Sequence, residues 1–225
     1  MRVWAGVAAL LALLLAGPVA GIEKKPLATY AREVWTTRDG LPHNQVNAIA
    51  QTREGYLWFA TWGGIVRYNG QEFRTYGRQN VPELRDNGIR GATVGPSGAL
   101  VLATSRGGVS VLRGERWQTW GEGQGLSQDE IMAAVEDRAG RIWVATESAG
   151  VNRISNGQVR VFDEDDGLTT GVTYAIMLDD NGAVWVGTGD GIARIEGDRV
   201  QVFGQANGLP QGAIFSLVAA PQGGV

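Results

Sequence analysis

The chain has 225 residues, 44% of them apolar, which is enough to build the core of one large domain or two small ones. Its formal net charge is −3 and its Lys and Arg residues do not cluster, which argues against nucleic-acid binding, because that function normally needs a basic face. The absence of cysteine excludes disulfides, thiolate metal sites and cysteine nucleophiles.

Residues 1–21 have the layout of a secretory signal peptide. Arg2 supplies a positive charge, an uncharged run rich in Leu and Ala follows, Pro18 breaks this run, and small residues suited to signal peptidase precede residue 22. The alternative is an uncleaved membrane anchor, since the uncharged run approaches the about 20 residues that cross a bilayer. In both cases we expect the rest of the chain to be exported, with residues 22–32 as a short lead-in.

From residue 33 onward the sequence repeats itself. The stretch GYLWFATWGGIVRYNG at residues 55–70 returns in altered form from Gly98, Gly140 and Gly182. Leucines mark the same register at spacings of 43, 42, 42 and 41 residues, at Leu41, Leu84, Leu126, Leu168 and Leu209. An internal repeat with this period is typical of the blades of a β-propeller.

One unit of the repeat predicts four short strands separated by turns that contain glycine. In the first unit these strands are expected over Val46–Ala50, Tyr56–Thr61, Ile65–Tyr68 and Phe73–Tyr76. Asn69-Gly70 is expected to form a two-residue hairpin turn between the last two strands. We therefore expect an all-β protein with four-stranded antiparallel blades.

Recurring Trp and Thr residues are expected to have structural roles. A single four-stranded sheet cannot bury both of its faces, whereas stacked blades cover one another. We expect Trp of the second strand to fill the space between blades, at Trp58, Trp143 and Trp185, with Val101 instead in the second unit. We expect Thr to form hydrogen bonds at strand ends, at Thr61, Thr104, Thr146 and Thr188.

Residues 33–225 are expected to form an incomplete ring. Trp35 precedes Leu41 by six residues, as Trp120, Phe162 and Phe203 precede the later leucines, so residues 33–36 match a fourth strand without its first three. In a closed propeller such a strand completes the last blade and hides the sheet edges. Residues 41–208 supply about four blades and Leu209 opens a fifth, whereas a ring of seven blades would need roughly 290 residues. The remaining blades are expected outside this sequence, and the isolated piece is expected to associate through its open edges.

The segment WTTRDGLPHNQVNAIAQTREGYLWFATWGGIVRYNG, at residues 35–70, resembles the two-component regulator propeller repeat in its Asp-Gly-Leu start, its Asn-x-Val strand and its Leu-Trp strand. The second unit departs from the pattern, since Leu84 lacks a preceding Asp-Gly and Val101 replaces Trp. The resemblance implies an N-terminal fragment of the periplasmic sensor region of a bacterial receptor, whose output is a hybrid histidine kinase or a GGDEF diguanylate cyclase.

The resemblance also implies where this chain acts and with what. It implies a location on the periplasmic side of the inner membrane, with membrane attachment through a downstream helix outside this sequence. The implied partners are an oligosaccharide or another small molecule, together with the missing C-terminal blades and the output domain. We expect no enzymatic activity in this chain, no cofactor and no metal.

Candidate ligand-binding residues lie in two kinds of loop that share one face, which we call the mouth of the propeller. These are the loops that lead into the first strand of each unit and the turns between second and third strands. The candidates are Trp62, His43, Asn44, Asn87, Arg106, Asp129, Glu147 and Asp190. Trp62 is suited to stacking on a sugar ring, although it could instead pack on Tyr30, Tyr56 or a neighbouring blade, and the polar candidates could simply be solvated.

Other interpretations remain open. Residues 163–167 are acidic, but their spacing does not fit the Asp-x-Asp-x-Asp-Gly calcium loop, so a polar turn is favoured. A propeller enzyme, such as a lyase similar to the streptogramin-inactivating family, would need a convergent catalytic set, and His43 is the single histidine. A scaffold that binds another protein is the third alternative. The Asp-Gly-Leu and Leu-Trp features favour the sensor.

Overall fold

The computed structural model of the chain describes Thr29 and residues 31–220. The chain divides into two compact units, Met1–Val34 and Trp35–Val225. Every described strand lies in the second, which we call the propeller unit. The predicted signal peptide over residues 1–21 and most of the lead-in over 22–32 lie outside the described residues.

The described part of the propeller unit contains four antiparallel sheets of four strands each, the blades of a partial β-propeller. Blade 1 consists of β1 (Val46–Gln51), β2 (Leu57–Thr61), β3 (Gly64–Tyr68) and β4 (Phe73–Tyr76). Blade 2 consists of β5 (Ile89–Val94), β6 (Leu100–Thr104), β7 (Val109–Arg113) and β8 (Arg116–Trp120). Blade 3 consists of β9 (Ile131–Glu136), β10 (Ile142–Thr146), β11 (Val151–Ser155) and β12 (Gln158–Phe162). Blade 4 consists of β13 (Thr173–Leu178), β14 (Val184–Thr188), β15 (Gly191–Glu196) and β16 (Arg199–Phe203).

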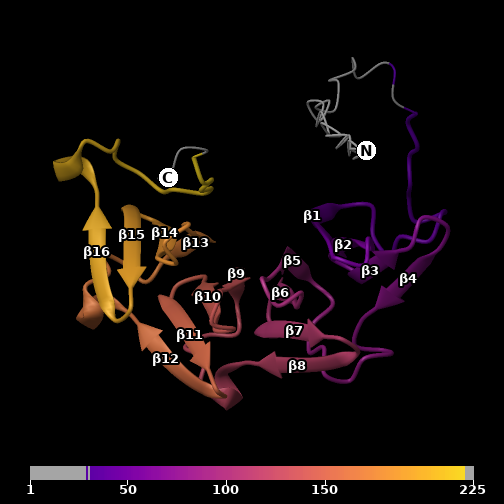
Figure 1. The fold of residues 1–225 in the computed structure, drawn as a ribbon, viewed down its shortest axis with the longest axis horizontal. Helices are drawn as coiled ribbons and strands as arrows, with labels where there is room; N and C mark the ends of the chain where they lie inside the picture. The colour runs from indigo at the N-terminus through magenta and orange to yellow at the C-terminus, as the bar shows by residue number, and fades with distance from the viewer. Residues whose placement is uncertain (1–28, 30, 221–225) are drawn as a thin grey trace, which may run out of the picture. The chain divides into compact units, whose positions relative to one another are not determined.

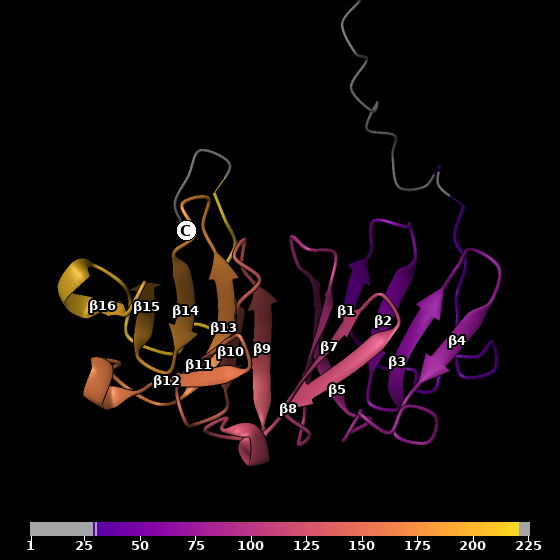
Figure 2. The ribbon, with the colours of Figure 1, turned by 60° about the horizontal axis from the view of Figure 1, so that its bottom comes forward.

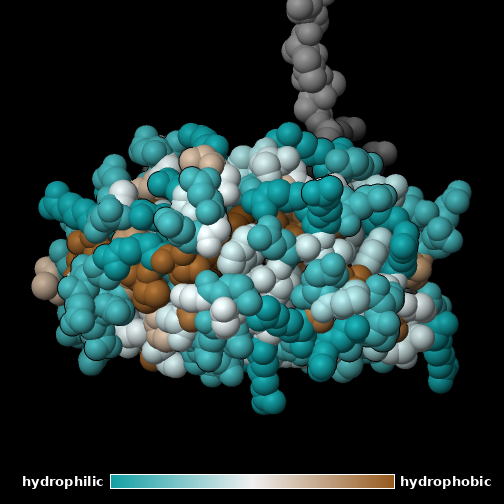
Figure 3. All heavy atoms as spheres, turned by 90° about the horizontal axis from the view of Figure 1, so that it is seen from below, coloured by the Kyte–Doolittle hydropathy of each residue, from teal (hydrophilic) through white to brown (hydrophobic). Residues whose placement is uncertain are grey.

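Neighbouring blades contact one another through their first strands. β1 contacts β5, β5 contacts β9, and β9 contacts β13, so these strands form the inner side of the unit, with the fourth strands outside (Figure 1). Figure 2 shows the same blades from another direction, with the strands of each blade side by side. Seen from the side of β8 and β12, the surface is mostly hydrophilic, with apolar residues in separate small groups (Figure 3).

The register leucines Leu126, Leu168 and Leu209 each follow a tight turn. After β8, β12 and β16 come the 3₁₀ turns η2 (Glu122–Gln124), η3 (Glu164–Asp166) and η4 (Gln205–Asn207). Each ends at a glycine with positive φ, a conformation that disfavours other residues, as at Gly125 with φ 96°. None of these helical turns in the described part of the chain has the length and hydropathy needed to cross a membrane.

The turn between β3 and β4 differs from the expected two-residue hairpin. Tyr68 pairs with Phe73, so residues 69–72 form a longer connection. The side-chain Oδ1 of Asn69 accepts hydrogen bonds from the backbone N–H groups of Gln71 at 2.9 Å and Glu72 at 2.8 Å. The prediction of a two-residue turn was wrong because Asn69 is the first residue of the connection, where its side chain accepts backbone N–H groups further along, and not one of two central residues.

A cluster of buried side chains fills each contact between neighbouring blades. Trp58 lies in the cluster between blades 1 and 2, and Trp143 lies in the cluster between blades 3 and 4, with 3% and 1% of their surface exposed. Burying a side chain of this size contributes a few kcal/mol of stability, about 25 cal/mol for each Å² of apolar surface. The tryptophans thus hold successive blades together.

The other face of blade 1 holds a separate cluster around Trp35. Phe59 and Val66 belong to it, whereas Trp58 and Ile65, the preceding residues on the same strands, face blade 2. The ring centroid of Trp35 lies 5.9 Å from that of Phe59 and 4.8 Å from that of Tyr68. Phe162 packs in the same way on the equivalent face of blade 4.

The fourth strand expected at residues 33–36 is not formed, since residues 31–36 are assigned to no strand. A strand needs a hydrogen-bonded neighbour, and no described strand pairs with this segment. The aromatic side chain of Trp35 nevertheless occupies the interblade position that the repeat register predicts.

The residues after Leu209 likewise form no strand among those described, although they follow blade 4. The backbone N–H of Ile214 donates to the carbonyl of Thr188 at 2.9 Å. The ring of Phe215 lies 4.6 Å from that of Tyr174, measured between centroids. The start of the fifth repeat is therefore attached to blade 4 without a sheet of its own.

Candidate ligand site at the propeller mouth

The second residue of each first strand lies in the same register and differs from blade to blade. These residues are Asn47, Arg90, Met132 and Tyr174. Because the first strands contact one another, the four side chains form a row along the inner side of the unit, which we call the inner row. The ring contact between Tyr174 and Phe215 adds an aromatic side chain beside the last of them.

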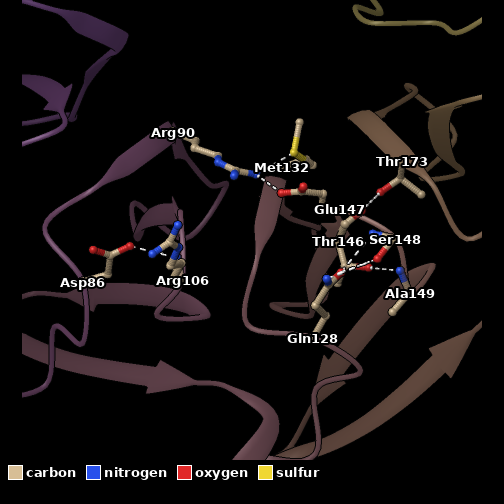
Figure 4. Close-up of polar contacts among 10 residues, drawn as sticks. All are labelled: Asp86, Arg90, Arg106, Gln128, Met132, Thr146, Glu147, Ser148, Ala149 and Thr173. Atoms are coloured by element: carbon tan, nitrogen blue, oxygen red, sulfur yellow. Dashed lines mark hydrogen bonds and ion pairs between the residues drawn. The ribbon is translucent and has the colours of Figure 1, made fainter.

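Part of the inner row lines a cavity of about 430 Å³. Its lining residues are Arg90, Met132, Glu147, Ser148, Val172 and Tyr174. The guanidinium Nη1 of Arg90 donates to Oε2 of Glu147 at 2.9 Å, and the two side chains point toward one another from β5 and from the turn after β10 (Figure 4). Half of the Glu147 side chain is exposed, so this pair contributes little to stability and its hydrogen-bonding groups face solvent.

The turns that form the mouth are fixed by the recurring threonines. Each Thr Oγ1 donates to a backbone carbonyl within its own turn, and also accepts a backbone N–H there. The hydroxyl of Thr146, for example, donates to the carbonyl of Gly150 at 2.8 Å and accepts from the N–H of Ala149 at 3.1 Å. All four threonines are buried, namely Thr61, Thr104, Thr146 and Thr188. They hold the residue that follows each of them at the mouth.

The loops of blade 3 are tied to each other by two polar side chains. The backbone N–H of Ser148 donates to Oε1 of Gln128 at 2.9 Å, and Nε2 of Gln128 donates to the Ser148 hydroxyl at 3.2 Å (Figure 4). These bonds hold the turn that carries Glu147 against the loop leading into β9. The backbone of Glu147 is therefore fixed within blade 3, whereas the guanidinium of Arg90 reaches from blade 2 to Glu147 and to Sδ of Met132 in blade 3.

Three of the predicted site residues form hydrogen bonds within their loops. The side-chain oxygens of Asn44, Asn87 and Asp129 accept backbone N–H groups from the segment before each blade, at 2.8 Å in every case. Each of these residues follows its register leucine by three positions. In the described structure they hold the loops in place, and their contact with a ligand stays a prediction.

The other polar candidates, His43, Arg106 and Asp190, are exposed. His43 accepts the backbone N–H of Gln45 at Nδ1, and the backbone N–H of Arg106 donates to Oδ2 of Asp86 at 2.8 Å (Figure 4). Asp190 is exposed in the turn after β14. Only Glu147 among the predicted site residues lines the cavity of the inner row.

Trp62 lies against blade 2 and keeps 39% of its surface exposed. A Cβ atom placed on Gly88 would lie 3.1 Å from Cε3 of the Trp62 ring, so the ring rests on the backbone of that glycine. Packing on a neighbouring blade was one of the two interpretations open from the sequence. The remaining exposed part of the ring leaves the stacking interpretation open as a proposal.

Sequence reasoning missed Arg90, Met132 and Tyr174 because it looked for site residues in loops. The signal that could have found them is the register itself, since the second residue of each first strand changes chemistry, whereas the residue after it is always Ala or Gly. The acidic turn at Asp163 behaves as a polar turn, in which Asp163 Oδ1 accepts the N–H of Asp165 at 3.0 Å and Asp166 pairs with Arg160. Across the described residues, no group of three His, Cys, Asp or Glu side chains could hold a metal ion.

The repeat family is identified by comparison. The two-component regulator propeller family matches residues 40–63, 125–148 and 167–190, which cover the starts of blades 1, 3 and 4. The chain is thus a partial β-propeller, and it carries two-component regulator propeller repeats, as the sequence predicts. The comparison with curated proteins gives no significant match.

Solved structures share the fold. The extracellular domain of one protein from B. thetaiotaomicron, classed as a hybrid two-component system, is 20% identical with a TM-score of 0.66, over 76% of this chain and 26% of that one. A second such domain from the same organism is 24% identical with a TM-score of 0.61, over 73% of this chain and 25% of that one. Virginiamycin B lyase from Staphylococcus aureus is 17% identical with a TM-score of 0.57, over 71% of this chain and 55% of that one. The chain therefore spans about a quarter of the length of the two extracellular domains.

Proposed function

We propose that this chain is part of the periplasmic ligand-sensing region of a bacterial receptor, and that it binds an oligosaccharide or another small molecule at the propeller mouth. The repeat family and the fold shared with extracellular domains of two-component systems support this proposal. The partners of the chain are the further blades and an output domain of the histidine kinase or diguanylate cyclase type. The chain itself performs no chemistry and is exported.

The observation that carries the proposal is the inner row, in which Arg90 pairs with Glu147. The scaffold of buried Thr and Trp residues repeats, whereas the residue that faces the mouth changes from amide to cation to thioether to phenol. A constant scaffold with variable residues at one face is how a repeat fold acquires a specific site. Arg90 and Glu147 can bind sugar hydroxyls, and the exposed ring of Phe215 beside Tyr174 offers a surface for stacking.

A test of the proposal is calorimetric titration of the protein with a panel of neutral and acidic oligosaccharides. For a ligand that binds, Arg90→Gln is expected to weaken affinity by at least tenfold, because a charge-assisted hydrogen bond is lost. The control is Arg116→Gln, which removes an exposed arginine at the start of β8, outside the mouth. Affinity that is unchanged in Arg90→Gln, or equally weakened in both variants, would place the ligand elsewhere and overturn the proposed site.

The lyase alternative rests on the fold shared with virginiamycin B lyase, and a likeness at 17% identity speaks for the fold alone. Turnover of an oligosaccharide or a cyclic peptide by the isolated protein would favour an enzyme. Saturable binding without turnover is expected for a sensor.

A further inference from the structure

The blades differ in what accepts the indole N–H of the interblade tryptophan. In blade 3, Nε1 of Trp143 donates to Oδ2 of Asp137 at 2.8 Å, and in blade 4 Nε1 of Trp185 donates to Oδ2 of Asp179 at 3.0 Å. Each aspartate precedes its tryptophan by six residues. The equivalent tryptophan of blade 1 is Trp58, and the residue six positions before it is a threonine.

Blade 1 therefore lacks the acceptor that blades 3 and 4 supply. Nε1 of Trp58 and Oγ1 of Thr52 are both buried and have no hydrogen-bond partner among the described residues. Buried polar groups normally form a hydrogen bond within the protein, because burial removes the water molecules that would otherwise bind them. The Thr52 side chain is one bond too short to place an oxygen where Asp137 places its carboxylate.

An arginine lies opposite each of these tryptophans on the neighbouring strand. Arg67 pairs with Trp58 across β2 and β3, as Arg153 pairs with Trp143 across β10 and β11. The guanidinium of Arg153 forms an ion pair with Asp198 of the next blade at 2.8 Å. The guanidinium of Arg67 lies 4.4 Å above the Tyr56 ring and makes no ion pair or hydrogen bond within the described part of the chain.

These unpaired groups line a cleft between blades 1 and 2, which extends from the ends of β1 and β7 to the outer strand β4. It consists of two adjoining cavities of about 320 and 350 Å³ that share Arg67, Leu112, Gly114 and Glu115. The first cavity is also lined by Thr52 and Trp58, and the second by Tyr76 and Trp117. The cleft thus offers an unpaired indole donor and an unpaired guanidinium at one end and two aromatic rings at the other.

We propose that this cleft is a second ligand site, beyond the one at the mouth, and that it binds a small molecule with one carboxylate and a planar or apolar ring. The carboxylate accepts the indole N–H of Trp58, as Asp137 does for Trp143, and pairs with Arg67, as Asp198 does with Arg153. The ring lies on Tyr76 and Trp117. Because Nε1 of Trp58 is buried, binding includes rotation of the Thr52 side chain away from it.

The charge of the lining favours a single carboxylate. Arg67 and Arg74 supply two positive charges, whereas Glu54 and Glu115 supply two negative ones. The lining is therefore neutral overall, so a ligand with several spread charges gains nothing from it, whereas one compact carboxylate can lie next to the arginines and away from the glutamates.

The test uses benzoate as the probe and benzamide as its neutral counterpart, with ¹H–¹⁵N spectra of the tryptophan indoles as the readout. Benzoate is expected to shift one indole resonance, which is absent in Trp58→Phe, and benzamide is expected to leave that resonance in place. Arg67→Gln is expected to weaken benzoate binding by about tenfold. If benzamide or inorganic phosphate shifts the same resonance as strongly, or if benzoate shifts none, the carboxylate site is ruled out.

A substitution in the chain itself gives an independent test. Thr52→Asp places a carboxylate at the position of Asp137, so it is expected to raise the melting temperature and at the same time to weaken benzoate binding by at least tenfold. Gln158→Glu adds the same charge at an exposed position on β12 and is expected to change neither. Benzoate that binds Thr52→Asp as well as it binds the unaltered protein would contradict the proposal.

Discussion

Asp137 accepts the indole N–H of Trp143 across 2.8 Å while both residues are almost completely buried. The same carboxylate also accepts the backbone N–H groups of Ala139 and Arg141 and pairs with the Arg141 guanidinium at 2.6 Å. One side chain therefore closes the turn between β9 and β10 and fixes the aromatic ring that joins blade 3 to blade 4.

Removing this carboxylate should be costly. Asp137→Ala leaves the buried indole N–H and the turn amides without an acceptor, and an unsatisfied buried donor costs about 1–3 kcal/mol. We expect the free energy of unfolding to fall by about 3 kcal/mol, measured by urea denaturation. Asp180→Ala, at an exposed position in the equivalent turn of blade 4, should change it by less than about 0.5 kcal/mol. Equal effects of the two substitutions would contradict this role of Asp137.

The Asp137 carboxyl should also make stability depend on pH. Burial raises its pKa, but the hydrogen bonds from Trp143 and Arg141 and the Arg141 charge outweigh burial, so the pKa is lowered in the folded protein. A lowered folded pKa means that this stabilisation is complete above the unfolded pKa of about 3.9 and is lost as the pH falls through the folded pKa. The difference in unfolding free energy between the protein and Asp137→Asn should therefore be constant above about pH 5 and shrink toward pH 2. A difference that stays constant over that whole range would show that the pKa is not lowered.

Trp35 should stabilise blade 1 although no strand surrounds it. Its ring contacts Phe59, Tyr68 and Phe73, so Trp35→Ala removes three aromatic contacts and is expected to cost about 2–3 kcal/mol, less than at a fully buried site. The control is Val34→Ala, since Val34 is 74% exposed. Thermal unfolding that is unaffected by Trp35→Ala would mean that the cluster contributes nothing to the stability of the blade.

The Arg90–Glu147 pair should matter for binding and not for folding. Because half of the Glu147 side chain is exposed, Glu147→Gln should change the free energy of unfolding by less than about 0.5 kcal/mol. Its melting temperature should match that of the unaltered protein in differential scanning calorimetry. A clear loss of stability would show that the pair holds blades 2 and 3 together.

Much of the fold can be predicted because the repeat is a local signal. The register of Leu41, Thr61 and Trp58 recurs at near-constant intervals. Each of these side chains packs or forms hydrogen bonds within its blade or against the neighbouring one. Strand bounds in the first blade accordingly differ from the expected ones by one residue at most. The turn after Tyr68 was misjudged because the Asn69 side chain can bond forward as well as sit at the centre of a hairpin.

Less of the site could be predicted, because it depends on which side chains from different blades come together. Arg90 and Glu147 are 57 residues apart, and nothing in the spacing relates them until β5 and β10 are placed in neighbouring blades. The unpaired Trp58 indole is also invisible in the sequence of blade 1. The missing partner of Trp58 becomes visible only in the structure, where Asp137 accepts the indole N–H of Trp143 and Thr52 stands at the equivalent position of blade 1.

The inner row has a consequence for how propellers built from these repeats diversify. Each of its side chains comes from a different blade, and the hydrogen bonds of the recurring threonines, which fix the turns of each blade, do not involve it. A single nucleotide change in one repeat can therefore alter one contact at the mouth while the scaffold still folds. The number of possible combinations of side chains in the inner row grows as the product of the choices at each blade, so a few repeats can produce many surfaces of different chemistry.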